Sequence, residues 1–311
     1  MFIVTGGAGF IGSNVVRELN RRGRTDILVV DNLERAEKFR NLSDLVIQDF
    51  LDKRTFRAML DAGTFNLPVD GIIHNGACSD TMNDDGRYML ENNFGDSKAV
   101  LHHALAKNIP LVYASSAATY GASPSFEPIP ANERPMNVYG YSKLLFDQYV
   151  RHLMPDMRST VVGLRYFNVY GPREDHKGRM MSVLHQLLRQ LKDTGVCRLF
   201  EGTEGYGHGE QVRDFVFVGD IVDISLHFAQ GRPTQGIFNA GTGQARSFNA
   251  IAQTLIDHLG QGRIEYIPFP ETLRGKYQSF TQADILSLRA AGYTKAFTPL
   301  EDGIRKTLQE R

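Results

Sequence analysis

The fold is decided by residues 2–19, FIVTGGAGFIGSNVVREL. The apolar residues at its start predict a short buried strand, and the apolar spacing that follows predicts an amphipathic helix. Gly6, Gly9 and Gly12 lie between the two, and Gly7, Gly9 and Gly12 also fit the pattern G-x-G-x-x-G. Glycines at these positions permit a tight turn, let the backbone approach a pyrophosphate and let the helix pack closely on the strand. The stretch therefore predicts a dinucleotide-binding loop.

The next apolar run ends on Asp31, nineteen residues after Gly12. A carboxylate at about this spacing is typical of a ligand for a ribose hydroxyl, which favours NAD. However, Lys38 and Lys53 follow in segments where a 2′-phosphate would need cations, and Asn32 can donate a hydrogen bond. The residues by themselves leave both NAD and NADP open.

Short apolar runs alternate with helix-length segments as far as about residue 168. The runs are FIVT, ILVVD, LVIQ, GIIHNGA, IPLVYASS and STVVGLRYFNVY. This alternation is typical of βαβ units, in which a parallel sheet is buried on both faces. It predicts an α/β fold with a Rossmann-like, doubly wound parallel sheet.

The pattern loosens after residue 168, where we expect a helix over about Met180–Lys192 and a strand near Val196–Phe200. The runs VRDFVFVGDIVDISLHFA and GIFNAGTG are expected to return to the main sheet. We therefore predict a smaller, mixed α/β substrate lobe and a cleft between the two parts. The predicted division is residues 1–168 plus about 214–240 for the dinucleotide-binding domain, and about 169–213 plus 241–311 for the lobe.

Composition excludes several classes of function. The chain has 311 residues, 42% of them hydrophobic, and its 35 basic and 35 acidic residues balance. This neutral balance gives no indication of binding to nucleic acid or to an acidic membrane surface. Cys78 and Cys197 lack metal-ligand spacing, which argues against a metal site and suits a reducing compartment. With no long apolar run and a strand at the first residues, we expect a cytoplasmic protein without a membrane span.

A Ser–Tyr–Lys set predicts hydride-transfer chemistry. Tyr139 and Lys143 are four residues apart on a predicted helix, so they share one face. A neighbouring ammonium favours the phenolate and lowers the pKa of the tyrosine, which allows Tyr139 to take a proton from an alcohol. A serine at the end of the preceding strand can bridge phenol and substrate, and we prefer Ser116 to Ser115. Tyr141 points to another face of the helix and is the weaker candidate.

The segment GPREDHKGRMMS, residues 171–182, is dense in charge. Such runs are usually solvated loops, so the residues alone favour a surface position for Lys177.

The motifs TGGAGFIGSN, SSAATYG, YGYSK and RYFNVYGPRE resemble those of the extended short-chain dehydrogenases/reductases that act on nucleotide sugars. FNVYGPRE, HKG, LFEG, RDFV, IEYIPFP and FTQAD extend the resemblance along the chain, to the ADP-L-glycero-D-manno-heptose 6-epimerase family. The resemblance implies an isomerase that interconverts the D-glycero and L-glycero forms of ADP-heptose at carbon 6, for lipopolysaccharide core synthesis. It also favours NADP over NAD and implies a homo-oligomer, specifically a homopentamer.

The family pattern implies a catalytic role for Lys177, beside Tyr139, Lys143 and Ser116. The expected cofactor-binding positions, from the glycine pattern and from the resemblance, are Gly6, Gly9, Phe10, Ile11, Gly12, Asp31, Asn32, Lys38, Lys53, Asn75, Gly76, Ala77, Cys78, Ser79, Asn92, Lys143 and Val169. The implied substrate-binding positions are Ser116, Asn168, Arg179, Gln186, Phe200, Glu201, Gly202, Thr203, Arg213 and Tyr277.

The chemistry explains why two proton-transfer groups are needed. The carbon to be inverted is next to no carbonyl, so simple deprotonation is unfavourable. Oxidation to a ketone removes the stereocentre, and rotation of the ketone presents its other face to the returning hydride. The oxygen then lies beyond the reach of Tyr139, and a partly desolvated lysine can serve there.

Four departures from the family pattern concern the substrate pocket: Arg179 replaces a small residue, Gln186 replaces a histidine, Asn75 replaces an acid, and residues 205–211 form a glycine-rich insertion. The sequence leaves two rival functions to consider. Another nucleotide-sugar enzyme is the first, although Ala117 and Ala118 lack the acids that a dehydratase needs and a UDP-sugar 4-epimerase does not use the HKG lysine. A non-catalytic dinucleotide sensor is the second, and the intact Ser–Tyr–Lys set argues against it.

Overall fold

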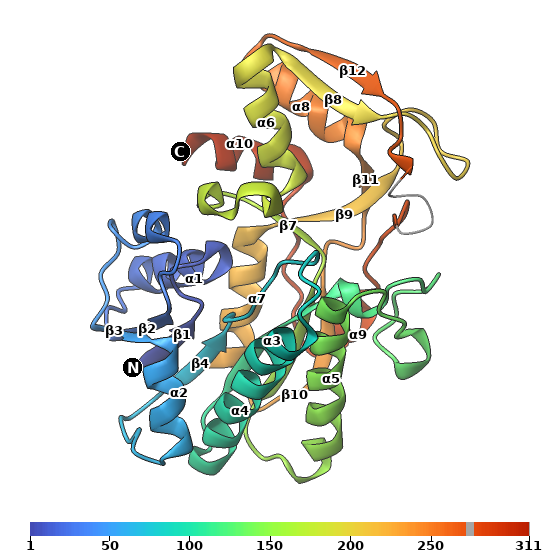
Figure 1. The fold of residues 1–311 in the computed structure, drawn as a ribbon. Helices are drawn as coiled ribbons and strands as arrows, with labels where there is room; N and C mark the ends of the chain where they lie inside the picture. The colour runs from blue at the N-terminus through green and yellow to red at the C-terminus, as the bar shows by residue number, and fades with distance from the viewer. Residues whose placement is uncertain (272–276, 311) are drawn as a thin grey trace.

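A seven-stranded parallel sheet forms the centre of the molecule (Figure 1). The computed structural model describes residues 1–271 and 277–310. The strand order is β10-β6-β5-β4-β1-β2-β3, which reverses direction between β1 and β4. The strands are β1 (Phe2–Thr5), β2 (Ile27–Asp31), β3 (Asp49–Asp52), β4 (Gly71–His74), β5 (Leu111–Ser116), β6 (Val161–Tyr166) and β10 (Gln235–Ala240). This topology confirms the predicted Rossmann-like sheet, and in such folds ligands bind where the order reverses.

Both faces of the sheet are covered by helices, as the unbroken apolar runs predicted. Phe2 and Val4 pack on one face with α1 (Phe10–Arg21) and α7 (Val218–Gln230). Ile3 points to the other face. There it joins residues of α2 (Lys53–Asp61), α4 (Asp96–Lys107) and α5 (Val138–Leu153). Each fully buried side chain of this size stabilises the fold by about 1.5–3 kcal/mol.

A smaller second part lies above the sheet in Figure 1. Its parallel strands β8 (Val196–Phe200) and β12 (Arg263–Ile267) pair with each other. Leucines of α6 (Val183–Thr194) pack there with residues of α8 (Phe248–Leu259) and α10 (Leu300–Gln309). The sequence placed the helix within three residues of α6 and predicted β8 at its observed position.

A third sheet contains β7 (Asn168–Tyr170), β9 (Val212–Phe217) and β11 (Ala245–Ser247). The expectation that residues 212–217 return to the main sheet was therefore wrong, whereas β10 does return to it. The reason lies in buried polar side chains: Asp214 accepts backbone hydrogen bonds from Thr242 and Gly243. A buried carboxylate needs such partners, and they lie outside the main sheet.

Two apolar runs that were predicted as strands have a different structure. LVIQ was expected as a strand, but β3 begins after it at Asp49. Leu45 and Ile47 pack against the core without joining a ladder. STVVGLRYFNVY divides at Phe167 into β6 and β7, which belong to different sheets. Shorter elements are η1 (Ala36–Asn41), α3 (Gly86–Leu90), η2 (Glu91–Gly95), η3 (Ala117–Thr119), η4 (Pro130–Asn132), η5 (Met154–Asp156), η6 (Asp175–Met180) and α9 (Leu286–Ala290).

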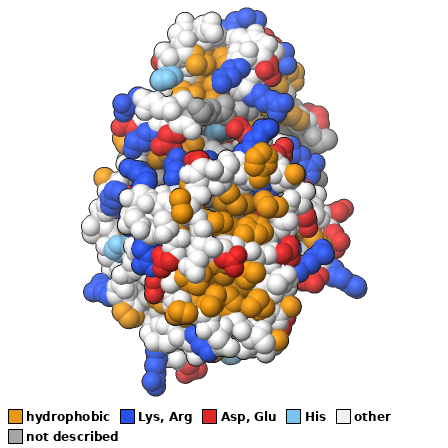
Figure 2. All heavy atoms as spheres, turned by 90° about the vertical axis from the view of Figure 1, so that its left-hand side faces the viewer, with side chains coloured by type: hydrophobic (Ala, Val, Ile, Leu, Met, Phe, Trp, Pro, Cys, Tyr) orange, Lys and Arg blue, Asp and Glu red, His pale blue; other side chains and the backbone are white. Residues whose placement is uncertain are grey.

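The face that lies on the left of Figure 1 is turned to the viewer in Figure 2. Hydrophobic side chains gather in its middle and lower parts, with charged side chains around them (Figure 2). Phe39 and Val46, in the segment between β2 and β3, have exposed fractions of 56% and 59%. Clustered apolar surface of this kind is a feature of interaction sites.

Candidate active site

A cavity of about 830 Å³ opens where the strand order reverses. Residues at the carboxyl ends of β1, β2, β4 and β5 line it, together with the segment before α6. Its size falls in the range of small-molecule sites. Most predicted cofactor and catalytic residues meet at this one cavity, including Gly9, Asp31, Tyr139 and Lys177.

The glycine loop is packed too tightly for larger side chains. Gly6 has a positive φ of 64°, and a Cβ on Gly12 would lie 2.2 Å from the carbonyl oxygen of Gly6. Gly9 stands at the start of α1 without a capping side chain. The first N–H groups of the helix are therefore available to an anion, and the helix dipole favours negative charge there.

Asp31 lies at the end of β2 and links the glycine loop to a lysine. Its carboxylate accepts hydrogen bonds from the backbone N–H of Ala8 (3.1 Å) and of Asn32 (2.8 Å). The ammonium of Lys38 forms an ion pair with the same carboxylate. Lys38 is thereby held against the Asp31 carboxylate at the cavity.

Lys53 and Asn92 meet across the cavity. Lys53 begins α2 and donates a hydrogen bond to the Asn92 side chain, which lies in the π-helical turn η2. Asn75 accepts a hydrogen bond from the Tyr166 hydroxyl (3.0 Å), while its own Nδ2 has no partner within the part of the chain that the structure describes. A buried amide donor of this kind usually finds a partner, so it favours a ligand in the cavity.

Ser116, Tyr139 and Lys143 come together where β5 ends and α5 begins. Asn137 caps α5 by accepting the N–H of Gly140 (2.8 Å), which fixes the first turn that carries Tyr139. Lys143 donates to the carbonyl of Ala114 (2.9 Å). An ammonium has three hydrogens, so Lys143 can also donate to hydroxyl groups of a ligand.

The pKa values of this set follow burial. Burial raises the pKa of Tyr139, and a hydrogen bond with the Ser116 side chain partly offsets the effect. Burial likewise lowers the pKa of Lys143 to about 8, against the opposing charge of Asp147. The lowered pKa that the sequence predicted for Tyr139 is therefore wrong for this state of the protein, because desolvation of the phenolate dominates.

Lys177 reaches the cavity from η6, the segment that precedes α6. Its ammonium lies 3.6 Å from Oε2 of Glu174 and 5.1 Å from the ring centre of Phe10. Burial would raise the pKa of Glu174, but the hydrogen bond with His185 and the charge of Lys177 lower it below its usual value. Glu174 is thus a carboxylate, and it fixes the lysine at the edge of the cavity.

The predicted substrate positions fall into two groups. Asn168, Arg179 and Arg213 line the cavity with Ser116. Gln186 instead donates to the carbonyl of Met181 (2.8 Å) and lies outside the lining.

Residues 200–203 also lie outside the lining of the cavity, and a ring cluster connects them to it. The ring centre of Phe200 is 6.4 Å from that of Tyr277. The Arg213 guanidinium lies 4.8 Å from the centre of the Tyr277 ring. The backbone of the predicted insertion meets Gly202, where a Cβ would lie 2.1 Å from the carbonyl oxygen of Tyr206.

Sequence reasoning missed several polar residues at the cavity, among them Arg35, Asp80 and His74. Arg35 donates to the carbonyl of His176 (2.8 Å), and Asp80 pairs with Arg179 (2.8 Å). His74 lies at the end of β4, and burial with the nearby Lys143 charge lowers its pKa to about 3. The sequence indicated these residues only by where they lie, since each is at or shortly after the carboxyl end of a predicted strand.

Comparisons with known proteins agree with this architecture. A family model described as the NAD dependent epimerase/dehydratase family matches residues 2–241. The chain belongs to this family. An epimerase/dehydratase relative from Alkalilimnicola ehrlichii, named ADP-L-glycero-D-manno-heptose-6-epimerase, is 57% identical over 308 residues, which are 99% of this chain and 96% of the relative. The resemblance drawn from the sequence motifs is thereby confirmed.

Solved structures of epimerases share the fold. The crystal structure of Helicobacter pylori ADP-L-glycero-D-manno-heptose-6-epimerase has a TM-score of 0.85 and 31% identity, covering 99% of this chain and 95% of its own. The Thermus thermophilus UDP-glucose 4-epimerase, in complex with NAD, has a TM-score of 0.78 and 27% identity, covering 99% and 98%.

The site fits the nicotinamide dinucleotide on which the epimerase/dehydratase family depends. The glycine loop has no room for a Cβ at Gly12, and the Asn75 amide offers a donor that meets no acceptor among the residues that the structure describes. Within residues 1–271 and 277–310, no group of three or more His, Cys, Asp or Glu side chains could hold a metal ion. No helix of the same ranges combines the length and apolar character needed to cross a bilayer.

Proposed function

We propose that the protein is an ADP-L-glycero-D-manno-heptose 6-epimerase, which inverts carbon 6 of the heptose by transient oxidation. The single observation that carries this proposal is that Tyr139 and Lys177 reach one cavity from different elements, α5 and η6. Two proton-transfer groups suit an inversion in which the oxygen changes sides. The identity of 57% to the Alkalilimnicola ehrlichii relative supports the same substrate.

In the first half of the reaction, Tyr139 takes the proton of the 6-hydroxyl group and Ser116 holds the oxygen. A bound nicotinamide dinucleotide supplies the acceptor for the hydride and later returns it. Lys143 keeps a positive charge at the base of the site, which opposes the effect of burial on the Tyr139 pKa once the phenol must ionise. Its bond to Ala114 holds the ammonium in place.

In the second half, rotation about the bond to the ketone carbon presents the opposite face of the group. Its oxygen then points away from Tyr139, and we assign the return of the proton to Lys177. Glu174 stabilises the protonated lysine from 3.6 Å and limits the movement of its side chain. The reverse reaction uses the same two groups in the opposite order.

Arg213 is the residue we assign to the diphosphate. Burial lowers the pKa of its guanidinium, because the charged group has lost contact with water. An anion beside the guanidinium would stabilise its positive charge in place of that water. Tyr277 stacks on the guanidinium, which leaves its planar edge for bidentate hydrogen bonds to phosphate oxygens. Phe200 and Tyr277 offer aromatic surface next to this anion site.

We infer that NADP is the preferred cofactor. Lys38 pairs with Asp31 and offers a positive charge to a 2′-phosphate, which supports this choice. Lys53, Asn32 and Arg35 line the same cavity and carry further donors that suit such a phosphate. Because Asp31 can also bind ribose hydroxyls, NAD is expected to bind more weakly rather than not at all.

The test is stereochemical. Purified protein is incubated with ADP-D-glycero-D-manno-heptose without added cofactor, and the two epimers are separated by anion exchange. Inversion without net change in nicotinamide absorbance is the expected result. Absence of inversion, even after addition of NADP⁺ or NAD⁺, would exclude the heptose substrate, and UDP- and GDP-sugars would then be tested.

We also infer that the chain assembles into a homo-oligomer. The hydrophobic side chains gathered on the face in Figure 2 support a contact between copies there. Size-exclusion chromatography with light scattering tests this inference, and a monomer at micromolar concentration would contradict it.

A further inference from the structure

One face of α5 carries three functional groups in sequence. Tyr139, Lys143 and Asp147 are spaced four residues apart, so their side chains follow one another along the helix. Tyr139 and Lys143 line the cavity, whereas Asp147 is completely buried behind it. A buried carboxylate is costly unless donors surround it, so its surroundings show what it holds together.

Asp147 accepts four hydrogen bonds, one at Oδ1 and three at Oδ2. The donors are the hydroxyls of Tyr113 (3.0 Å) and Ser115 (2.9 Å) and two nitrogens of Arg165 (3.0 and 2.9 Å). Tyr113 and Ser115 belong to β5, and Arg165 belongs to β6. This one side chain therefore fastens the catalytic helix to two neighbouring strands.

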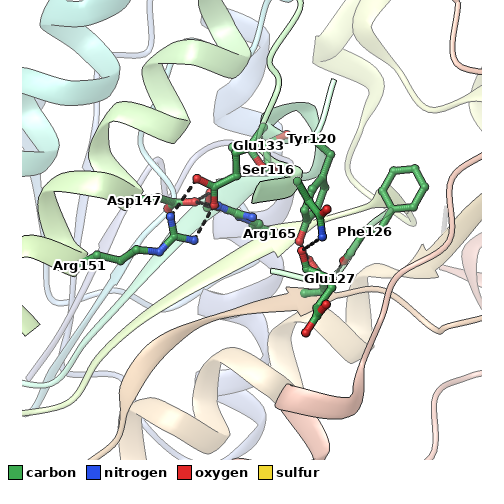
Figure 3. Close-up of polar contacts among 12 residues, drawn as sticks. Ser116, Tyr120, Phe126, Glu127, Glu133, Asp147, Arg151 and Arg165 are labelled. Carbon is green, nitrogen blue, oxygen red and sulfur yellow. Dashed lines mark hydrogen bonds and ion pairs between the residues drawn. The ribbon is translucent and has the colours of Figure 1, made fainter. Parts of the chain in front are cut away.

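The attachment lies beside the predicted catalytic serine. Ser115 directly precedes Ser116, and the strand register places Ser115 opposite Arg165. Arg165 has no exposed surface and also pairs with Glu133, which in turn receives two hydrogen bonds from Arg151 (2.9 and 2.5 Å). In Figure 3 the guanidinium groups of Arg151 and Arg165 point toward the carboxylates of Glu133 and Asp147.

A second contact of Arg165, with Tyr120, holds the turn that follows Ser116. The guanidinium carbon of Arg165 lies 4.9 Å from the centre of the Tyr120 ring. The Tyr120 hydroxyl donates to Asn239 on β10 (2.5 Å). Asn239 also donates to the carbonyl of Phe126 (2.6 Å). Contacts on both sides of Ser116 are thus anchored in the same buried network.

We propose that Asp147 is a positioning residue for the proton-transfer set, which acts through Ser115 and Lys143 and does not touch the substrate. Its hydrogen bonds align α5 with the end of β5, and its negative charge balances the buried ammonium of Lys143. The proposal rests on the role that the proposed function gives to Ser116, Tyr139 and Lys143.

The charges around Lys143 support the second part of this role. Burial lowers the pKa of Lys143 to about 8, and Asp147 is the main group that opposes the shift, followed by Cys78 from the loop after β4. His74, on β4, also faces the ammonium and is neutral, since burial and Lys143 lower its pKa to about 3. Removal of the charge at Asp147 is therefore expected to lower the Lys143 pKa further, so that the ammonium is lost at a lower pH.

The test compares Asp147→Asn with Glu133→Gln. Each substitution removes one carboxylate partner of Arg165 and one negative charge from the network. Of these two carboxylates, Asp147 is the one that opposes the lowering of the Lys143 pKa by burial. We expect Asp147→Asn to move the alkaline limb of kcat to lower pH and to reduce kcat at pH 9 by about tenfold, the effect of a shift of one pKa unit above the Lys143 pKa of about 8. KM for the nucleotide sugar should change little. Glu133→Gln should lower thermal stability while the alkaline limb keeps its wild-type position.

Ser115→Ala provides a second test, because it removes one hydrogen bond without unpairing a charge. We expect kcat to fall severalfold with the alkaline limb unchanged. A wild-type kcat for Ser115→Ala would overturn the alignment role, even if Asp147→Asn does not fold. An alkaline limb in Asp147→Asn that coincides with that of Glu133→Gln would overturn the charge role.

The pH dependence of NADP⁺ affinity is measured for the same variants. This readout depends on Lys143 but not on the identity of the sugar, so it separates failure of the proposal from failure of the heptose assignment. If wild-type protein does not turn over ADP-heptose, a shifted binding profile in Asp147→Asn alone still supports the positioning role. An unshifted profile contradicts it.

Discussion

The ammonium of Lys177 lies 3.6 Å from Oε2 of Glu174, a side chain without solvent exposure. Glu174 also accepts the backbone N–H (2.7 Å) and the hydroxyl (2.8 Å) of Ser182, the N-cap residue of α6. Lys177 is therefore not a freely moving surface lysine, although it lies in a highly charged segment. Its carboxylate partner is anchored to α6, which places the lysine at a defined position on the cavity edge.

Replacement of Lys177 by Met should remove the second proton-transfer group. We expect kcat to fall by about 10²- to 10⁴-fold, the usual contribution of a general acid or base, with dinucleotide still bound. Lys192→Met, at an exposed position on α6, is the matched control and should retain activity. Steady-state assays of epimer formation measure both, and wild-type turnover by Lys177→Met would return the lysine to a structural role.

Tyr139→Phe should lower kcat to a similar degree, because it removes the phenol but keeps the ring. Tyr141→Phe is the matched control: Tyr141 lies two residues further along α5, with an exposed fraction of 45%, and its loss should have little effect. The double variant of Tyr139 and Lys177 should be no worse than the poorer single variant, since the two groups serve one reaction. Equal losses in Tyr139→Phe and Tyr141→Phe would refute the assignment.

Lys38→Ala tests the choice of cofactor. Loss of a charge-assisted contact to a 2′-phosphate should weaken NADP⁺ binding by roughly 10- to 100-fold, while NAD⁺ affinity changes little because Asp31 becomes free to bind ribose hydroxyls. Lys107→Ala, on α4 beside Asn66, should leave both affinities unchanged. Fluorescence titration gives the dissociation constants, and equal weakening for the two dinucleotides would count against a phosphate contact.

His74 should make the fold sensitive to acid. Its folded-state pKa of about 3 lies below the ordinary value of 6.5, so the unfolded chain binds more protons between these values. The contribution of His74 to the free energy of unfolding is fully present above pH 6.5 and is lost as the pH falls toward 3. Replacement by Asn should reduce the loss of unfolding free energy between pH 7 and pH 5 by about 1–2 kcal/mol.

Urea unfolding at the two pH values measures this difference. His258→Asn, at an exposed position near the end of α8, is the control and should behave as wild type. If the His74 and His258 variants lose stability equally with acid, then the buried imidazole does not titrate as inferred.

The parts of the site that depend on local sequence could be predicted. Gly6, Gly9 and Gly12 are set by the turn from β1 to α1, and the pairing of Tyr139 with Lys143 is set by one helical turn. Each feature lies within a few residues, so periodicity and spacing are sufficient to find it. The same reasoning gave the parallel sheet.

The remaining features depend on contacts between distant segments. Asp147 and Arg165 meet through the register of β5 and β6, and Arg179 meets Asp80 across the cavity. No local pattern indicates such pairs. The direction of the Tyr139 pKa shift was also beyond the sequence, since it depends on how deeply α5 is buried.

The central claim is that carbon 6 is inverted by oxidation and return of the same hydrogen, with Tyr139 and Lys177 handling only the hydroxyl proton. The most direct test uses ADP-D-glycero-D-manno-heptose labelled with deuterium at carbon 6, in ordinary water. The account predicts that the L-glycero product retains the deuterium at carbon 6, as measured by mass spectrometry and NMR. Replacement of deuterium by solvent hydrogen in the product would contradict it and would indicate deprotonation at carbon.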